Sequence, residues 1–207
     1  MINTPCRKLK NGKNKMETMF KKIVNQFFQK VNPSTKAGVP TLLTQRLRFR
    51  APAQTDYDNI LDLGSDPEVM RYITYGKTQN PKEARADLEQ RIQLSQGVHG
   101  YWITEDQITG DFIGWMALRP LPGKDHFELG YRFLKKHWGK GYATEAGQRL
   151  LQYAFQELNL PKVVAIAMPE NQASRRVMEK LGFQFIGFDH FHGVDCVVYQ
   201  IQQEHFV

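Results

Sequence analysis

Hydrophobic and polar positions repeat with two different periods between residues 41 and 203, and the repeats predict short elements of both kinds. Alternation with a period of two, as in TQRLRFR, indicates half-buried strands. Apolar residues that recur every three or four positions, as in EAGQRLLQYAF, indicate amphipathic helices. The expected strands cover 44–50, 100–105, 111–119, 126–134 and 162–168, followed by a hairpin of 183–191 and 194–203. The expected helices cover 55–66, 66–73, 80–96, 140–158 and 171–182.

The residues at the ends of these segments support the assignment. Pro67 and Pro81 stand at first helical positions, and Asp66 before the first of them is a favoured N-cap residue. Gly182 stands where a helix C-terminus commonly has glycine. The order of elements predicts an α/β (α+β) protein with a mostly antiparallel mixed sheet flanked by helices. One strand–helix–strand crossover is expected over 130–168.

The first forty residues follow a different pattern. Residues 1–15 are polar and basic without a period, and NPSTKAGVP at 32–40 has the composition of a linker. Between them, residues 16–31 place Met, Phe, Ile and Val at helical spacing, which predicts an amphipathic helix. We therefore expect a basic N-terminal extension at 1–40 and a separate domain at 41–207. The helix is expected to pack on the domain or on a second copy in a homodimer, and the alternative is reversible contact with a membrane surface or another partner.

The charge distribution follows the same division. The 207-residue chain carries a net charge of +7. Residues 1–40 contain nine Lys and Arg and one Glu, whereas residues 41–207 carry a net charge of −1. The basic balance therefore belongs to the extension, and we expect no specific binding of nucleic acid by the domain.

Cysteine, histidine and apolar residues exclude several other classes of protein. Cys6 and Cys196 are far apart, so neither a disulfide framework nor a cysteine metal site is indicated. His190 and His192 alternate on one predicted strand, but no third ligand is near, and no metal is expected. No run of about 18 apolar residues predicts a membrane span. The N-terminal segment lacks the apolar core of a secretory signal, so the expected location is the cytoplasm.

A glycine-rich turn between the fourth predicted strand and the next helix is the strongest candidate site. HWGKGYATEA places Gly139 and Gly141 in or just before the first helical turn, where each glycine costs about 1 kcal/mol relative to alanine. Bare N–H groups at a helix N-terminus bind phosphates, and Lys135, Lys136 and Lys140 add positive charge. On the glycines alone, a phosphate site and a plain loop that needs positive φ are equally well supported. The chain lacks GxxxxGK[ST] and the third glycine of GxGxxG, which excludes P-loop and dinucleotide fingerprints.

Two stretches in the right order carry a resemblance to a known family. GYRFLKKHWGKGYATEA, followed about thirty residues later by NQASRRVMEKLGF, resembles the GNAT superfamily of acyl-CoA-dependent N-acetyltransferases. It is similar in particular to the RimJ/RimL-like branch, which acetylates N-terminal amines of ribosomal proteins. The resemblance covers about residues 41–201 and places the acetyl-CoA signature at 138–143. It implies a GNAT-like fold and an enzyme that moves an acetyl group from acetyl-CoA to a protein N-terminal α-amine or a small amine.

The resemblance also implies where the co-substrate acetyl-CoA binds. The CoA pyrophosphate would lie on the backbone amides of 139–143, with the Thr144 hydroxyl beside them. The pantetheine arm would bond to the main chain at 131–133, and the N–H of Phe133 or Leu134 would polarise the thioester carbonyl. The implied cofactor-binding residues are Tyr131, Arg132, Phe133, Leu134, Trp138, Gly139, Lys140, Gly141, Tyr142, Ala143, Thr144 and Asn171.

Candidates for proton transfer lie on the strand before the turn and on the last helix. A protonated amine must lose a proton before it attacks, and the leaving thiolate needs one. Glu128 is the candidate base, since it alternates with Gly130 and Arg132 on one strand face; the alternative is an ion pair with Arg132 or with a neighbouring strand. Many relatives carry a tyrosine acid where this chain has Met178. Ser174, one turn earlier, is therefore the substitute candidate.

Other assignments stay open at the level of sequence. Tyr72, Tyr75 and Trp115 are candidates for lining an amine pocket, with core packing as the alternative. His126 and His137 are expected to face solvent. A different class of function also fits, namely a non-catalytic acyl-CoA-binding sensor or docking module. The acceptor could equally be a polyamine, an amino sugar or another small amine.

Overall fold

The computed structural model describes residues 38–73, 76–121, 124, 126–191 and 193–206. The chain divides into two compact units, Met1–Lys36 and Ala37–Val207. The predicted helix at 16–31 belongs to the first unit and lies outside the described residues.

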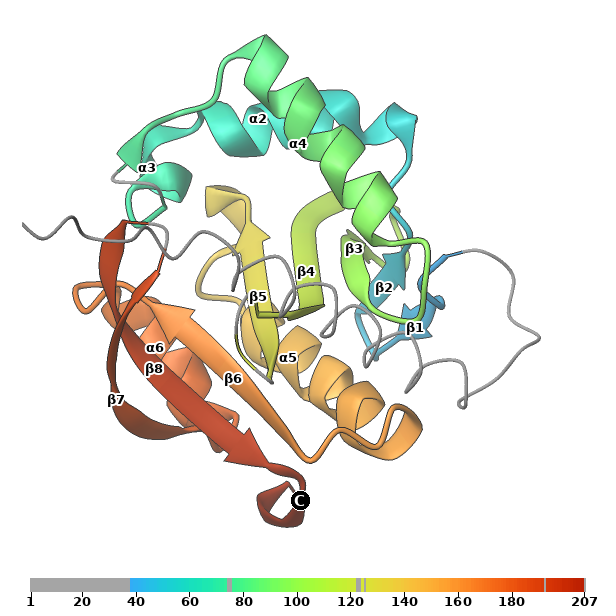
Figure 1. The fold of residues 1–207 in the computed structure, drawn as a ribbon. Coiled ribbons are helices and arrows are strands. Elements are labelled where there is room, and N and C mark those ends of the chain that lie inside the picture. Colours follow the sequence, from blue (N-terminus) through green and yellow to red (C-terminus); the bar gives the residue numbers. More distant parts are fainter. Residues whose placement is uncertain (1–37, 74–75, 122–123, 125, 192, 207) are drawn as a thin grey trace, which may run out of the picture. The chain divides into compact units, whose positions relative to one another are not determined.

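Eight strands of the described residues form one sheet in the second unit, in the order β1-β2-β3-β4-β5-β6-β8-β7 (Figure 1). They are β1 (Leu42–Leu43), β2 (Leu47–Arg50), β3 (Gly100–Asp106), β4 (Phe112–Pro120), β5 (Phe127–Phe133), β6 (Lys162–Ala167), β7 (Gln184–Phe191) and β8 (Val194–Gln202). All neighbouring strands pair antiparallel except β5 and β6, which are parallel. The predicted mixed, mostly antiparallel sheet is confirmed.

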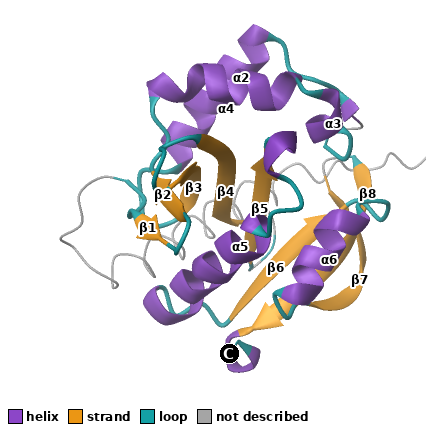
Figure 2. Cartoon of the chain, turned by 180° about the vertical axis from the view of Figure 1, so that it is seen from behind, coloured by secondary structure: helices purple, strands orange, loops and turns teal. Residues whose placement is uncertain are grey.

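Helices cover both faces of this sheet, with α4 on one face and α5 and α6 on the other (Figures 1 and 2). They are α2 (Tyr57–Ser65), α3 (Pro67–Met70), α4 (Pro81–Leu94), α5 (Tyr142–Gln152) and α6 (Gln172–Lys180), with 3₁₀ turns at Gln54–Asp56, Lys135–His137 and Gln203–His205. The Asp66 side chain accepts from the Glu68 N–H at 2.8 Å, which confirms it as the N-cap of α3. Gly182 has φ +85° just after α6, as its position in the sequence predicted.

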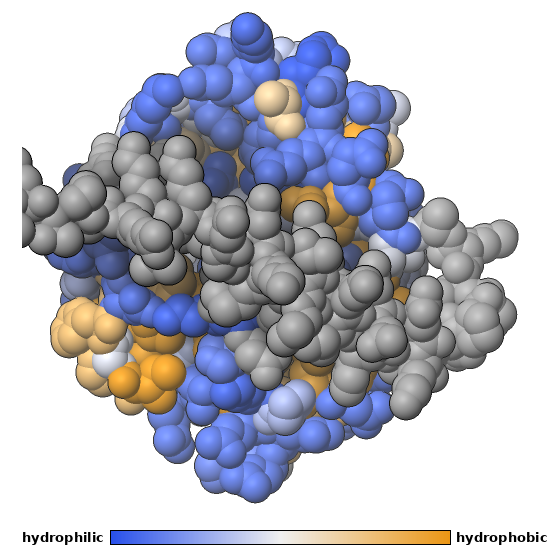
Figure 3. Space-filling view, viewed as in Figure 1, coloured by the Kyte–Doolittle hydropathy of each residue, from blue (hydrophilic) through white to orange (hydrophobic). Residues whose placement is uncertain are grey.

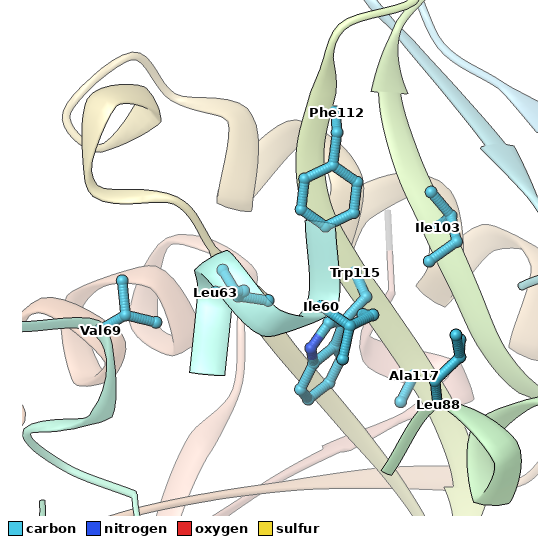
Figure 4. Close-up of a cluster of buried hydrophobic side chains, with 8 residues drawn as sticks. All are labelled: Ile60, Leu63, Val69, Leu88, Ile103, Phe112, Trp115 and Ala117. Carbon is cyan, nitrogen blue, oxygen red and sulfur yellow. The ribbon is translucent and has the colours of Figure 1, made fainter. Parts of the chain in front are cut away.

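One apolar cluster joins α2 and α4 to strands β3 and β4 (Figure 4). Its buried residues are Ile60, Leu63, Val69, Leu88, Ile103, Phe112, Trp115 and Ala117. Burial of such side chains is the main favourable term in folding. The cluster therefore packs α2, α3 and α4 against the side of the sheet that carries Trp115.

The long helix predicted at 140–158 is shorter and changes its winding. It begins only at Tyr142, because Gly139 and Gly141 have φ of +74° and +80°, values that a right-handed helix excludes. Its last turn, Tyr153–Glu157, is π-helical. The Leu158 N–H bonds to the Tyr153 carbonyl at 3.0 Å, the i to i+5 pattern of a π turn.

Strand β7 forms one edge of the sheet and exposes an apolar patch (Figure 3). The side chains are those of Phe185, Ile186 and Phe188, which are 49%, 56% and 72% exposed. An apolar edge of this kind is typical of a surface that another molecule covers. The expected homodimer stays a prediction. Within the described residues, no helix combines the length and the apolar character that a membrane crossing requires.

Candidate functional site

Strands β5 and β6 diverge soon after they pair, and the divergence opens a cleft that we call the β5–β6 cleft. The last paired residues are Glu128 and Val164. Beyond them β5 stays bonded to β4 as far as Phe133, and β6 stays bonded to β8 as far as Ala167 (Figure 1). The space between has a volume of about 260 Å³. Residues that the sequence singled out separately come together on its walls, namely Tyr72, Trp115, Glu128, Tyr131, Arg132, Asn171, Ser174 and Met178.

The edge of β5 that borders this cleft has main-chain groups that no neighbouring strand uses. Backbone N–H groups alternate in direction along a strand. The Leu134 N–H donates to the Ile113 carbonyl at 2.9 Å, so it points away from the cleft. Phe133 therefore points the other way, and its carbonyl accepts from Trp138 Nε1 at 2.8 Å. Leu134 as a donor to the thioester was a wrong prediction, and Phe133 is the remaining member of that pair.

The glycine turn ends in an open helix N-terminus. Gly141 is the N-cap of α5, and no side chain caps the helix there. The Glu145 N–H bonds to the Gly141 carbonyl at 3.1 Å, but the N–H groups of 142–144 precede the first intrahelical bond and have no such partner. The positive φ of Gly139 and Gly141 confirms that this loop needs glycine. Its role toward phosphate stays a prediction.

Arg46, in the turn between β1 and β2, holds the glycine turn in place. Its Nη1 donates to the Lys140 carbonyl at 3.0 Å, and its guanidinium lies 4.5 Å from the centre of the Tyr142 ring. Arg46 also pairs with Glu145 at 2.6 Å, and Thr44 Oγ1 donates to the same carboxylate. Burial alone would raise the pKa of Glu145, but the hydrogen bonds from Thr44 and Arg46 outweigh it, and the net pKa is lowered. No local sequence pattern signals these contacts, because they join residues 94 to 101 positions apart.

Three polar side chains meet where α6 begins. Asn171 Oδ1 accepts from the Ser174 N–H at 3.1 Å, so Asn171 is the N-cap of α6. This bond leaves the NH₂ end of the amide as the group that a ligand can use. The Tyr131 hydroxyl is hydrogen-bonded to the Ser174 side chain; burial raises the pKa of Tyr131, and this bond partly opposes the shift. Tyr131 was expected to act through its main chain, so the position of its hydroxyl is new information.

Glu128 lies opposite Arg119 of β4, and the two side chains form an ion pair of 2.7 Å. The pair with a neighbouring strand, left open by the sequence, is thus confirmed. The carboxylate still borders the β5–β6 cleft, and its side chain is 14% exposed. Glu128 therefore keeps both a structural partner and access to the cleft.

Arg132, the next but one residue after Gly130 on the same strand, lies over the Trp115 ring, 5.2 Å from its centre.

Some predictions concern residues away from the cleft. His137 was expected to face solvent, but both of its ring nitrogens are buried and its ring packs on Tyr142 at 6.0 Å. Burial, followed by Lys136 and Lys140, lowers the pKa of His137. Tyr75 and His192 lie outside the described residues. In the parts of the chain that are described, no group of three or more His, Cys, Asp or Glu could hold a metal ion.

Comparisons with known proteins agree with this geometry. The family model for the acetyltransferase (GNAT) domain matches residues 46–184. The chain is 36% identical over 147 residues to the uncharacterized protein YkkB of Bacillus subtilis, a match that covers 70% of this chain and 85% of the relative. It is 32% identical over 155 residues to the FsC-acetyl coenzyme A-N(2)-transacetylase of Aspergillus fumigatus, covering 71% of this chain and 66% of that protein.

Solved structures show the same fold. A GNAT-family acetyltransferase from Bacillus anthracis superposes with a TM-score of 0.71 at 27% identity, covering 80% of this chain and 99% of that one. The ribosomal L7/L12 alpha-N-protein acetyltransferase RimL, solved in complex with coenzyme A, gives a TM-score of 0.67 at 17% identity, covering 79% and 98%. At that identity the second likeness concerns the fold alone.

The split sheet, the glycine turn and the uncapped helix lie in one α/β domain with the fold of the solved acetyltransferases. The family match over two thirds of the chain then gives the particular assignment. The chain belongs to the GNAT family of acetyl-CoA-dependent N-acetyltransferases.

Proposed function

We propose that the chain transfers the acetyl group of acetyl-CoA directly to a primary amine, in a ternary complex inside the β5–β6 cleft. The observation that carries this proposal is the succession of two groups of backbone donors along one side of the domain. The first group lies on the open edge of β5, and the second lies in the glycine turn and the first turn of α5. An extended arm can add to a free strand edge, and a pyrophosphate binds a helix N-terminus.

In this proposal the glycine turn holds the phosphate end of acetyl-CoA. The backbone amides of 139–143 face the pyrophosphate, and the Thr144 hydroxyl and Lys140 add a donor and a positive charge. Arg46 positions the turn from behind through the Lys140 carbonyl. A phosphate group suits this turn because the uncapped N–H groups are donors without acceptors. The absence of a Cβ at the glycines leaves room for the phosphate to approach the backbone closely.

The pantetheine arm follows the edge of β5 toward Glu128. It bonds to the main chain of 131–133 in the manner of an added strand. The Phe133 N–H is the donor that stabilises negative charge on the thioester carbonyl oxygen in the transition state. The NH₂ group of Asn171 contacts the arm from the α6 side of the cleft.

The reaction moves two protons along with the acetyl group. The neutral amine nitrogen bonds to the carbonyl carbon, and the carbon–sulfur bond breaks. Glu128 accepts the proton that the amine loses, directly or through one water molecule. Ser174 supplies a proton to the departing sulfur and regains one through the Tyr131 hydroxyl bonded to it, which takes it from solvent. Glu128 releases the proton of the amine to solvent, so both groups return to their starting state. The products are an amide and free coenzyme A.

The names of related proteins support two kinds of acceptor. The Aspergillus relative is named for transfer to an N(2) atom of FsC, and YdaF of Bacillus subtilis, 45% identical over 75 residues, is named as a putative ribosomal N-acetyltransferase. We therefore retain both a protein N-terminal α-amine and a small amine as acceptor classes.

The test uses the full chain with acetyl-CoA and a panel of amines, including peptides with free N-termini, polyamines, amino sugars and amino acids. Release of free thiol and the mass of the acetylated product are measured together. Amine-dependent thiol release with an acetylated product supports the enzyme. A rise in melting temperature with acetyl-CoA, but no acetylated amine anywhere in the panel, would instead favour the non-catalytic acyl-CoA sensor.

A further inference from the structure

We propose that Arg132 recognises a carboxylate on the acceptor, so that the substrate class is an amine that carries a carboxylate in the same molecule. The inference rests on the proposed acetyl transfer in the β5–β6 cleft and names the chemistry of its acceptor.

The first argument is the position of Arg132 relative to the candidate base. Glu128, Gly130 and Arg132 alternate on one face of β5, and all three line the cleft. A side chain at Gly130 would meet no atom within 4 Å, so the floor between Glu128 and Arg132 is open. An amine placed over Gly130 has a carboxylate at one end and a guanidinium at the other. An amine with its own anionic group fits both ends.

The second argument is a set of buried donors without acceptors around Trp115. The Trp115 Nε1, the Arg132 Nε, and the Nε and Nη1 of Arg91 are buried, and none of them has a hydrogen-bond partner within the described chain. Arg91 comes from α4 and is only 5% exposed. It lies 4.1 Å from the centre of the Trp115 ring, with Arg132 at 5.2 Å from the same centre. A buried donor without a partner costs about 1–3 kcal/mol, and more when it is charged, so this arrangement favours a bound anion.

The third argument is the charge balance of the wall. Arg91 is paired with Asp87 at 2.9 Å, and Arg119 is paired with Glu128 at 2.7 Å. Arg132 is the positive charge left over among these five groups. Burial and the charge of Arg91 lower the pKa of Arg132 to about 10, with Asp87 opposing, so the guanidinium is still protonated at neutral pH. One excess positive charge matches one carboxylate, whereas a doubly charged phosphate would leave a buried negative excess.

The geometry also sets the distance between the two groups of the acceptor. A strand rises about 3.3 Å per residue, so the backbone positions of Glu128 and Arg132 are about 13 Å apart. Glu128 is turned toward Arg119 and Arg132 toward the Trp115 ring, both across β4, so neither side chain reaches along β5 to close this span. We therefore expect the best acceptors to have a spacer of several atoms between the two groups.

The experiment measures the preference for a carboxylate in the full chain and in Arg132→Gln. The acceptors are glycine, β-alanine, 4-aminobutyrate and 6-aminohexanoate, each paired with its carboxamide, and O-phosphoethanolamine serves as the phosphate arm. In the wild type we expect kcat/KM to favour the carboxylate of at least one longer pair over its carboxamide. In Arg132→Gln we expect this ratio to fall at least about tenfold, or about 1.4 kcal/mol. An acid and its carboxamide differ in the pKa of the amine, and this difference affects kcat/KM equally in both variants. It therefore cancels when the acid-to-amide ratio of one variant is divided by that of the other.

Arg85→Gln is the matched control. Arg85 lies on α4, as Arg91 does, and like Arg132 it has its guanidinium over an aromatic ring, that of Tyr57 at 4.2 Å, but it does not line the cleft. The ratio should stay at its wild-type value in this variant. Equal use of acids and amides by the wild type, a stronger preference for the phosphate, or an unchanged ratio in Arg132→Gln would each overturn the inference.

Binding without turnover separates this inference from the proposed function. Calorimetry with 6-aminohexanoate and its carboxamide, on protein saturated with coenzyme A, measures the same preference in the absence of chemistry. Arg132-dependent binding of the acid without any acetylation would overturn the proposed function and leave the carboxylate site standing. Acetylation of amines without any preference for the acid in either assay would overturn the carboxylate site and leave the proposed function standing.

Discussion

At the scale of single residues, Glu128 combines a structural contact with a proposed catalytic one. Its carboxylate pairs with Arg119 across β4 and β5 while it borders the cleft. The ion pair restricts the carboxylate to a few orientations. A base held in this way spends less entropy in reaching the amine, so the same contact that stabilises the strand pair also serves proton transfer.

Replacing Glu128 by Gln should lower kcat by about 10²-fold, because general base catalysis contributes roughly that much. The loss should be larger at low pH, where more of the amine is protonated and needs the base. The KM for acetyl-CoA should change little, because Glu128 lies beyond the proposed path of the arm. Steady-state rates from pH 6 to 9 check this. Equal loss at every pH would mean that another group takes the proton.

His99 links stability to pH. It packs edge-on against Phe127 at 5.3 Å, and burial lowers the pKa of His99 from 6.5 to about 4. The unfolded chain therefore binds the proton more readily than the folded one between these values. Stability contributed by neutral His99 is complete above about pH 6.5 and is lost as the pH falls toward 4, up to about 3 kcal/mol.

We expect His99→Phe to reduce the slope of unfolding free energy against pH between 6.5 and 4.5, measured by urea unfolding. His190→Gln is the control, since His190 is exposed and pairs with Asp195 at 2.9 Å on the β7–β8 hairpin. An identical slope in wild type and His99→Phe would show that His99 titrates normally.

At the scale of elements, two glycines with the same backbone conformation allow the effect of backbone strain to be distinguished from the effect of ligand binding. Gly139 has φ +74°, and a side chain there would meet nothing within 4 Å. Gly110, in the turn between β3 and β4, has φ +76° and is equally open. Substitution by Ala should cost each position about 1 kcal/mol of stability through the left-handed backbone alone. Only Gly139 lies on the proposed phosphate site.

Gly139→Ala should therefore raise the KM for acetyl-CoA at least about fivefold, whereas Gly110→Ala should leave it unchanged at a similar loss of stability. The measurements are the melting temperature and the KM for acetyl-CoA of each variant. Equal KM values would mean that the turn needs its glycines for shape alone.

Local signals predicted the elements well, and contacts between distant parts of the chain were missed. Asp66 and Gly182 act on the backbone directly beside them, as an N-cap and as a residue with positive φ. Their roles at helix ends could therefore be inferred from the sequence. The Arg46 contacts with the glycine turn join separate parts of the fold, and no period or motif encodes them. The direction of the Leu134 N–H depends on the strand register, which a one-residue shift reverses. The partners of Arg132 come from β4 and α4 and became visible only when the sheet and helix were packed.

At the scale of the whole molecule, charge and fold divide at the same point. The compact unit Ala37–Val207 contains the sheet, the cleft and the glycine turn. The net positive charge belongs to residues 1–40, which carry nine Lys and Arg against one Glu. The residues proposed to hold acetyl-CoA all belong to this second unit.

Deleting residues 1–36 should leave the Kd for acetyl-CoA within about twofold of the full-length value, measured by calorimetry. Binding to anionic vesicles, measured by sedimentation on both proteins, would show whether the basic segment contacts membranes. A truncated chain that folds but no longer binds acetyl-CoA would mean that the extension completes the site.

The short pairing of β5 with β6 has a consequence for the order in which substrates bind. Only two residue pairs join these strands, so the sheet consists of a β1–β5 part and a β6–β8 part linked mainly by the crossover through α5. In the proposed complex the pantetheine arm fills the gap and acts as an additional strand for β5. Acetyl-CoA is then a temporary part of the sheet as well as a reagent. The acceptor meets a complete pocket wall only after this strand is in place, which favours an ordered mechanism in which the donor binds first and coenzyme A leaves last.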